Sequence, residues 1–220
     1  MDFTPVVEGW RALLNGTVTT IVVTLSALAI SLVAGLLIGL ARLRPSIHLL
    51  YWPVTLYVTV IRGTPLLVQL FLLFFGLPQL GVQLPAFFCA VLGLSAYSAA
   101  YVSEVVRGAI QSIDRGQMEA ARSLGMSYHG AMRDIIVPQA LIRMVPPLGN
   151  EVVALIKNSA LVSLLTIHDL MFEGNAIISV TYRSLEVYLA IAGIYLVLTL
   201  TAGHALQRAE RALLRRGHLA

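Results

Sequence analysis

Five polar side chains interrupt the long apolar stretches of this chain: Arg62, Asn150, Glu151, Lys157 and Asn158. A charged group in apolar surroundings is costly unless it pairs or faces water, so each of these is a candidate for a functional contact. The guanidinium of Arg62 could hold a carboxylate through two parallel hydrogen bonds. The alternative is that Arg62 anchors the chain at a membrane surface or forms a structural pair with an acid.

The other four residues of this set predict a polar strip. Asn150, Glu151, Lys157 and Asn158 fall on adjoining faces of one expected helix. Such a strip could line a cavity at a subunit seam and offer both signs of charge to a zwitterion. In the alternative, Glu151 is interfacial and Lys157 pairs structurally across a subunit contact. Thr64 joins the candidates for a substrate pathway because it follows Arg62 in "RGTP", whose glycine and proline predict a bend.

No residues stand at the spacings of a metal site or a catalytic centre. His168 and Asp169 lack a further metal-type ligand at suitable spacing, so an outer-surface contact or simple helix termination is expected there. The single cysteine, Cys89, lies in an apolar run and is expected to be a packing residue. The chain also has no G-x-x-x-x-G-K-[ST] phosphate-binding loop. The sequence therefore predicts no catalytic residue, metal or cofactor in this chain.

A charged, capped segment, residues 114–147, separates two of the apolar runs. Asp114 and Gln117 fit a capping box, and Glu119 then suits the positive end of a helix dipole. Gly125 is expected to end this helix in a left-handed conformation, and Ser127 to cap the next one. The segment is therefore expected to be rigid.

The second helix of this insert carries one apolar stripe, and prolines follow it. Tyr128, Met132, Ile135 and Ile136 share a face, while Pro138 and then Pro146-Pro147 are expected to mark the return to the next apolar run. A flexible linker needs neither caps nor a stripe, so we predict a knob that docks into another protein. The alternative is a helix lying passively on the lipid surface.

The elements that position these residues are predicted to be membrane spans. Hydrophobic residues make up 58% of the 220 and charged residues only 12%, which excludes an ordinary soluble domain. Apolar runs of about 18 or more residues can cross the roughly 30 Å hydrocarbon core of a bilayer. We predict an all-α membrane protein with five spans, at roughly Thr17–Ala41, Tyr51–Phe75, Pro85–Val106, Leu148–Met171 and Leu185–Leu206. Residues 1–16 are expected to form an amphipathic outer segment, residues 17–206 the membrane domain and residues 207–220 a basic tail.

The basic residues predict the orientation of these spans. With the N-terminus outside, eleven of the 15 Lys and Arg fall in inside segments, and only Arg11 and Arg183 fall outside. Arg62 and Lys157 lie within apolar runs. Cytoplasmic segments carry such an excess, so the N-terminus is predicted outside and the C-terminus and insert inside. This bias accounts for the net charge of +4 without nucleic acid as a partner.

The first expected span carries a small residue at every fourth position: Ala27, Ser31, Gly35 and Gly39. Residues at this spacing share one helix face and allow a second backbone to approach closely. The alternative is that the row has no role, because small residues are common in membrane helices.

The insert carries a resemblance to a known family. "EAARSLGMSYHGAMRDIIVP" resembles the EAA motif of the permeases of binding-protein-dependent ABC importers, which reads Glu-Ala-Ala, three residues, Gly, nine residues, then Ile-x-Leu-Pro. Val137 stands where Leu is usual, which keeps the apolar character. The matching positions are Glu119, Ala120, Ala121, Gly125, Ile135 and Pro138.

The resemblance extends along most of the chain. "RGTPLLVQLFLLFFGLP" (residues 62–78) and "PPLGNEVVALIKNSALVSLLTIHDLM" (residues 146–171) are similar to the polar amino-acid branch, the histidine/glutamine/arginine-type transporters. The resemblance implies the five-span core of type I importers in a bacterial cytoplasmic membrane. It also implies the partners: an ATPase dimer at the insert, a second permease subunit that is identical or related, and an extracytoplasmic amino-acid-binding protein. ATP would be hydrolysed on the separate subunit, and the matching insert residues would contact it.

Two other function classes remain open at this point. An ion-gradient transporter would be expected to show internal repeats and discontinuous helices, whereas the five expected spans are unequal. A membrane scaffold would bind a partner through the insert without moving any solute. Loss of transport on ATP depletion at a constant ion gradient would distinguish the importer from the ion-gradient transporter. The scaffold predicts partner binding with no change in solute uptake when Glu119 is altered.

Overall fold

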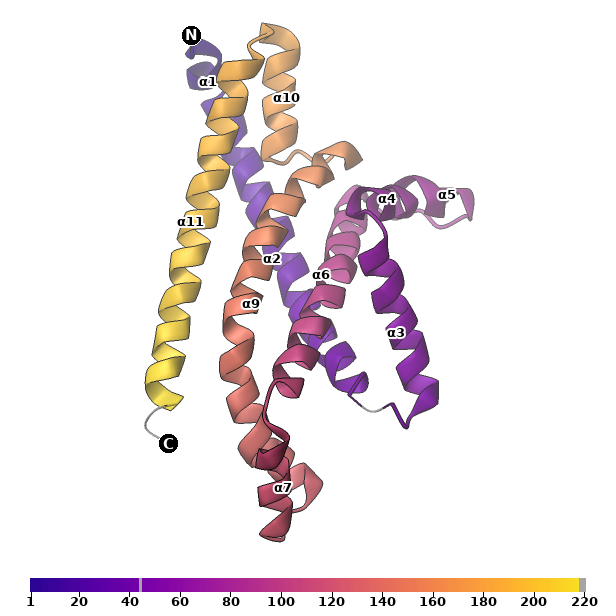
Figure 1. Cartoon of the computed structure of the whole chain (residues 1–220). Coiled ribbons are helices and arrows are strands. Elements are labelled where there is room, and N and C mark those ends of the chain that lie inside the picture. The colour runs from indigo at the N-terminus through magenta and orange to yellow at the C-terminus, as the bar shows by residue number, and fades with distance from the viewer. Residues whose placement is uncertain (44, 218–220) are drawn as a thin grey trace.

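The computed structural model describes residues 1–43 and 45–217, and their regular structure is entirely helical (Figure 1). Side chains are described through Arg211. Arg44, the end of the expected basic tail at residues 218–220, and the side chains of Arg215 and Arg216 lie outside the described residues.

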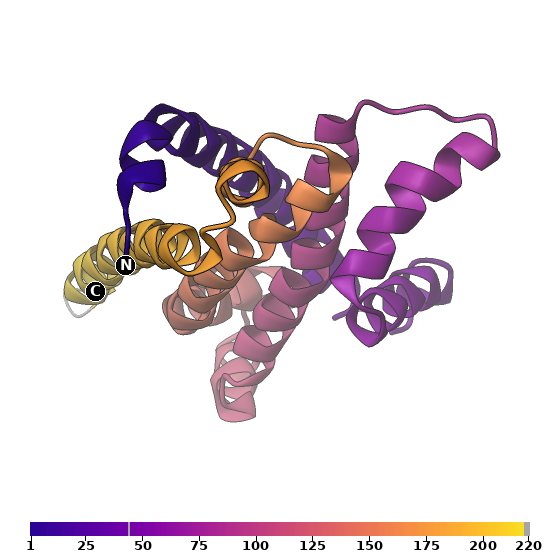
Figure 2. The same ribbon diagram turned by 90° about the horizontal axis from the view of Figure 1, so that it is seen from above.

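The helices run alternately between two ends of the molecule. We call these the insert end, where α7 lies, and the N-terminal end, and α11 runs from the N-terminal end toward the insert end (Figure 1). Seen from above, α11 lies at one edge and α3 at the other, with α2, α9 and α6 between them (Figure 2). The helices are α1 Thr4–Glu8, α2 Trp10–Ala41, α3 His48–Gly63, α4 Leu66–Phe71, η1 Leu72–Gly76, α5 Leu77–Gln79, α6 Ala86–Gln111, α7 Arg115–Ser123, α8 Tyr128–Ala131, η2 Met132–Ile136, α9 Val137–Asn158, η3 Ser159–Leu165, α10 Leu170–Thr181 and α11 Ser184–Gly217.

Among the described residues, four helical runs are long and apolar enough to cross a membrane. They are α2, α6, the run from Tyr128 to Leu165, and α11 through Arg211. A bent pair, α3 with the segment Leu66–Gln79, would make a fifth. The expectation of an all-helical membrane protein is therefore confirmed, with four or five candidate spans.

The bend expected at "RGTP" is present. The axis turns by 109° between α3 and α4–α5, so the second half of this pair lies across the N-terminal end of α6 (Figure 1). Thr64 and Pro65 are extended, with ψ of 146° and 136°. A proline has no N–H for a helical hydrogen bond, and it disfavours a helical conformation in the residue before it. The helix therefore ends before Thr64 and restarts after Pro65.

The small residues of α2 form its contact with α6, which confirms their predicted packing role. A Cβ atom on Gly35 would lie 2.5 Å from Val102 Cβ, and one on Gly39 would lie 2.8 Å from the Ser103 carbonyl oxygen. Ala27 and Ser31 are fully buried. The two backbones therefore approach as closely as only small residues permit.

The prolines after the insert, which were expected to mark the return to the next apolar run, lie within a continuous helical run. Pro138 lies in the first turn of α9, and Pro146 and Pro147 lie inside it. The π-helical turn η2 ends with Val137 N–H donating to Met132 O, directly before Pro138. The turn η1 has the same relation to Pro78, since Leu77 N–H donates to Leu72 O. The wider turn gives a proline ring room that an α-helical turn lacks, so the helix continues through it.

The expected fourth span is also shifted along the chain. The helical run starts at Tyr128 rather than near Leu148, and it ends at Leu165 rather than at Met171. Thr166 has a left-handed φ of 60°, and Asp169 then caps α10 by accepting from Phe172 N–H at 2.9 Å. The Asp169 side chain is fully buried against α2, where a Cβ on Gly16 would lie 2.7 Å from its carbonyl oxygen.

The N-terminal end is tied together by polar contacts. Asp2 N–H donates to Glu186 Oε1 at 3.0 Å, which joins the start of the chain to α11. The hydroxyl and the N–H of Thr4 both donate to Asp2 Oδ1 and lower the pKa of the Asp2 carboxyl. The helix α2 begins at Trp10, so residues 10–16 continue without interruption into the first expected span.

Candidate functional site

Arg62 stands at the last turn of α3 and faces α6. Its guanidinium carbon lies 5.2 Å from the centre of the Tyr101 ring, and its Nη1 lies 3.4 Å from Glu104 Oε1. The side chain still keeps 44% of its surface exposed. Arg62 therefore has the acidic partner expected if it forms a structural pair, but part of its side chain stays exposed.

Tyr97 and Tyr101 form the centre of this site. They lie one helical turn apart on α6, with ring centres 4.8 Å apart and hydroxyl oxygens 3.2 Å apart. Arg62 of α3 reaches α6 at Tyr101, and Glu151 of α9 reaches it beside Ser98, the residue after Tyr97. The fold thus brings a guanidinium and a carboxylate from two helices to one stretch of α6.

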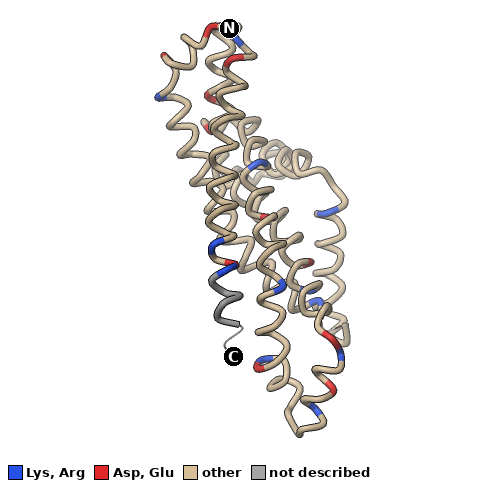
Figure 3. Tube along the Cα trace, turned by 60° about the vertical axis from the view of Figure 1, so that its left-hand side comes forward, with Lys and Arg blue, Asp and Glu red and all other residues tan. Residues whose placement is uncertain are grey.

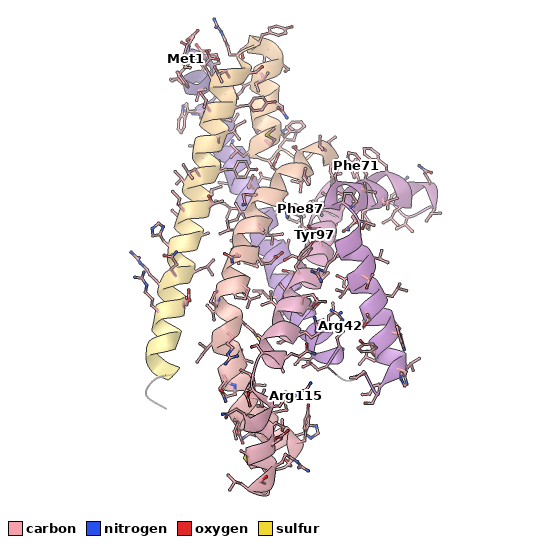
Figure 4. The ribbon with its side chains drawn as sticks, viewed as in Figure 1. Met1, Arg42, Phe71, Phe87, Tyr97 and Arg115 are labelled. Atoms are coloured by element: carbon pink, nitrogen blue, oxygen red, sulfur yellow. The ribbon has the colours of Figure 1, made fainter. Side chains whose placement is uncertain are left out.

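The two tyrosines are functional candidates that reasoning from the sequence missed. The available signal was their spacing of four residues in "AYSAAYVSE", which places both on one helix face next to Glu104. The Glu104 side chain is only 18% exposed and lies among basic groups. Arg42, one of these groups, and Tyr97 are labelled in Figure 4.

The other pathway candidates are not brought together in this chain. Asn150 faces α11 and lines a groove of about 190 Å³ with Gly149, Gly203 and Glu210. Lys157 is exposed and Asn158 half-buried, both in the last turn of α9. Within the described residues the polar strip of α9 therefore divides, with Glu151 toward α6 and Asn150 toward α11.

Thr64 and Gln69 hold the bend that presents Arg62. Gln69 Nε2 donates to Ile61 O at 2.8 Å, to Thr64 O at 3.1 Å and to Thr64 Oγ1 at 2.8 Å. Breaking a helix leaves carbonyls without N–H partners, and an unsatisfied carbonyl is costly in an apolar medium. Gln69 supplies the missing donor, so Thr64 is part of the bend.

Gln69→Glu is expected to destabilise the chain, because a carboxylate cannot donate to these carbonyls. The loss of the hydrogen bonds to the carbonyls of Ile61 and Thr64 is expected to cost about 1–3 kcal/mol. Thermal unfolding of the detergent-purified protein measures this loss. Gln79→Glu is the matched control, since Gln79 is exposed and makes one 3.3 Å bond to Phe75 O. Equal effects of the two substitutions would contradict the role assigned to Gln69.

The insert has the caps that the sequence predicted, with one difference. Asp114 Oδ1 accepts from Gly116 N–H at 2.7 Å, and Ser127 Oγ accepts from Gly130 N–H at 3.1 Å. Gln117, the expected capping-box partner, instead has its side-chain oxygen 3.5 Å from Gln139 Nε2. Asp114 therefore caps α7 without the reciprocal bond, because the side chain of Gln117 is directed toward α9.

Gly125 makes the turn between α7 and α8. Its φ is +85°, and the hydrogen bonds Gly125 N–H to Arg122 O and Met126 N–H to Ala121 O form a Schellman motif. Arg122 Nη1 also donates to Met126 O at 2.9 Å. The relative direction of the two short helices is therefore fixed by backbone and side-chain bonds together.

The motif residues of the insert divide into an exposed and an internal group. Glu119, Ala120 and Gly125 are exposed, whereas Ala121 is only 1% exposed and packs inside the insert. Leu124 is a large apolar side chain with 85% exposure beside this face. We call Glu119, Ala120, Leu124 and Gly125 the insert face, which is available to a partner. Ile135 is half-buried and Pro138 exposed, both farther along toward α9.

Most of the apolar stripe of the second insert helix packs within the chain, although Tyr128 stays 48% exposed. Ile136 is buried with Ile110 of α6 and with Ile113 just after it, and Met132 and Ile135 pack against the same cluster. Arg143 Nη1 donates to Ser112 O at 2.6 Å and fastens α9 to the same point. The stripe therefore holds the insert rigidly on α6, which argues against a helix lying passively on lipid.

Comparison with known proteins identifies relatives over nearly the whole chain. Residues 31–215 match the family described as "Binding-protein-dependent transport system inner membrane component". The probable glutamine ABC transporter permease protein GlnM of Bacillus subtilis is 37% identical over 203 residues, covering 91% of this chain and 92% of that protein. The arginine transport system permease protein ArtQ of Bacillus subtilis is 38% identical, covering 91% of both. The glutamine transport system permease protein GlnP of Escherichia coli (strain K12) is 37% identical, with 90% and 91% covered.

Solved structures give the same picture of the fold. A chain from the crystal structure of an amino acid ABC transporter with histidines superimposes with a TM-score of 0.91 at 44% identity, covering 96% of this chain and 99% of that one. A chain of the MetNI methionine ABC transporter in an inward-facing conformation gives a TM-score of 0.78 at 22% identity, covering 93% and 97%. The second likeness concerns the fold alone.

Proposed function

This chain belongs to the family of binding-protein-dependent transport system inner membrane components, and we propose from this premise that its substrates are polar amino acids. It is a multi-pass inner-membrane permease subunit of a binding-protein-dependent ABC importer. Members of this family translocate solute and leave ATP hydrolysis to a separate subunit. The relatives named for glutamine and arginine support the proposed substrate class.

The observation that carries the substrate class is that two opposite charges reach the same stretch of α6, Arg62 at Tyr101 and Glu151 at Ser98. Arg62 offers donors for a carboxylate, and Glu151 offers acceptors for an amino group or a basic side chain. A polar amino acid carries both kinds of group. Thr64 remains a proposed pathway residue because it forms the bend that presents Arg62. The proposed pathway also keeps Asn150, Lys157 and Asn158, which would lie toward a second subunit or at the ends of the path.

We propose that the insert end faces the cytoplasm and the N-terminal end the outside. Most Lys and Arg lie in the half of the molecule toward the insert (Figure 3). Cytoplasmic segments of membrane proteins carry such an excess. The binding protein would then deliver substrate at the end where α1 and α10 lie.

The insert face is proposed to contact the ATPase. Importer permeases of this family assemble with an ATPase and a binding protein. Glu119, Ala120 and Gly125 are exposed for this contact, and Leu124 adds an apolar side chain. Ala121, Ile135 and Pro138 would act by keeping the shape of the insert. Closure of two ATPases would move the inserts of two permease subunits and so alternate access to the pathway.

The test is purification of the intact importer in mild detergent, identification of the co-purifying subunits, and ATPase assays with single amino acids. A polar amino acid is expected to stimulate ATP hydrolysis. Arg62→Gln and Glu151→Gln are each expected to lower the affinity for that amino acid about tenfold or more, because each leaves a charged group of the substrate unpaired. Arg183→Gln, at the far N-terminal end, is the control and should bind normally. Stimulation by no amino acid, or unchanged binding in both variants, would count against the proposal.

A further inference from the structure

Glu104 is a single carboxylate that serves three arginines. Arg42 Nη1 donates to Glu104 Oε1, and Arg107 donates to Oε2 through Nε at 3.1 Å and Nη2 at 2.6 Å. Arg62 Nη1 lies 3.4 Å from Oε1. The guanidiniums come from α3, from α6 and from Arg42 at the C-terminal cap of α2, so the cluster lies where these helices meet.

The three contacts are not equivalent. The side chain of Arg42 is 11% exposed and that of Arg107 30%, and both make direct hydrogen bonds that fix the Glu104 carboxylate. Arg62 is 44% exposed and makes the longest contact, while its guanidinium also lies over the Tyr101 ring. Loss of the Arg62 contact would therefore leave Glu104 well bonded, whereas the other two contacts hold it in place.

The cluster has a surplus of positive charge. Three guanidiniums face one carboxylate, and the Nε of Arg42 is buried without a hydrogen-bond partner. Guanidiniums in excess over carboxylates attract an additional anion. Arg62 is the most exposed of the three, so an incoming anion can reach the cluster there.

We propose that Glu104 holds Arg62 in place while the pathway is empty and releases it to the carboxylate of an incoming amino acid. The inference rests on the proposed function, because it requires that Arg62 binds substrate. Glu104 is then a positioning residue: it keeps the guanidinium over Tyr101 and neutralises it in apolar surroundings. Glu104 also sets how strongly a substrate carboxylate is bound, because the Glu104 carboxylate and the substrate carboxylate compete for Arg62 and repel each other.

This competition predicts a specific effect of removing the charge of Glu104. In Glu104→Gln, a substrate carboxylate no longer competes for Arg62 and no longer meets a like charge. A substrate analogue with a neutral amide in place of the carboxylate gains nothing, and its positive amino group meets a more positive site. The ratio of affinities, acid over amide, should therefore rise, whereas a general loss of structure would weaken both ligands alike.

The experiment measures equilibrium binding to the purified importer complex, with L-glutamine and L-arginine as acids and their carboxamides as amides. The acid-to-amide ratio is expected to rise roughly fivefold in Glu104→Gln, as for the loss of one partly exposed ion pair. Arg107→Gln is the matched control, since it removes a partner of Glu104 Oε2 without touching Arg62. The acid-to-amide affinity ratio of Arg107→Gln should stay unchanged or fall.

Glu104→Asp provides a second test if the glutamine variant is not recovered as an intact complex. Aspartate keeps the charge beside Arg42 and Arg107 but draws the carboxylate back from Arg62, so the ratio should rise less than in Glu104→Gln. An unchanged or lower ratio, with normal binding by the wild type, would overturn the role of Glu104 alone. Failure of the wild type to bind any of the four probes would overturn the proposed substrate class, and this inference with it.

Discussion

Gly125→Val is expected to uncouple ATP hydrolysis from amino-acid uptake. Gly125 has a φ of +85°, a conformation that costs a residue with a side chain about 1–2 kcal/mol and a β-branched one more. The equilibrium ratio of the native turn to other conformations should then fall by a factor of roughly 5–30, and uptake should decrease as the native turn is lost. The spans should stay folded, because a Cβ at this position meets no atom within 4 Å. Uptake and ATPase activity are measured together in proteoliposomes that contain the complete importer.

Asparagine at the same position is the control for this substitution. Asparagine tolerates the left-handed conformation far better than valine. Gly125→Asn should therefore keep most of the uptake that Gly125→Val loses. Normal uptake by the valine variant would refute the idea that the angle between α7 and α8 transmits motion.

Gly35→Leu is expected to have the largest effect on folding. A Cβ on Gly35 would lie 2.5 Å from Val102 Cβ and 3.0 Å from Ala99 O, so α2 and α6 would have to separate. Overpacking of this kind costs about 3 kcal/mol or more, which corresponds to a decrease of about 6–12 °C in the thermal midpoint. Size-exclusion profiles and thermal unfolding in detergent measure the effect.

Gly193→Leu separates this packing effect from the mere addition of a leucine to a span. Gly193 lies in the middle of α11, and a Cβ there would meet no atom of the chain within 4 Å. This variant should be recovered in normal yield with a midpoint close to that of the wild type. An equal loss in both variants would mean that the fit between α2 and α6 is not the cause.

Local features of the fold could be predicted because each depends on neighbours in sequence. Asp114 and Ser127 cap their helices through N–H groups two or three residues away, and Gly125 makes its turn by its own backbone freedom. The break at Pro65 follows from a missing N–H. The close approach of α2 at Gly35 follows from side-chain size and helical spacing.

The arrangement of the polar residues could not be predicted in this way. The grouping of Glu104 with three arginines depends on how α2, α3 and α6 meet, and no sequence spacing encodes that. The division of Asn150 from Glu151 depends on which neighbour each face of α9 contacts. The prolines at 138 and 146–147 predicted interruptions, but a π-turn and the packing of α9 overrode that local preference.

The unbroken helical run from Tyr128 to Leu165 has a mechanical consequence. With a rise of about 1.5 Å per residue, Glu151 lies about 35 Å along this rod from Tyr128. The rod acts as a lever arm: a tilt of about 10° at its lower end would displace the Glu151 carboxylate by about 6 Å, more than the reach of a hydrogen bond. A small rotation of the insert is therefore large enough to form or break a hydrogen bond between Glu151 and a bound molecule.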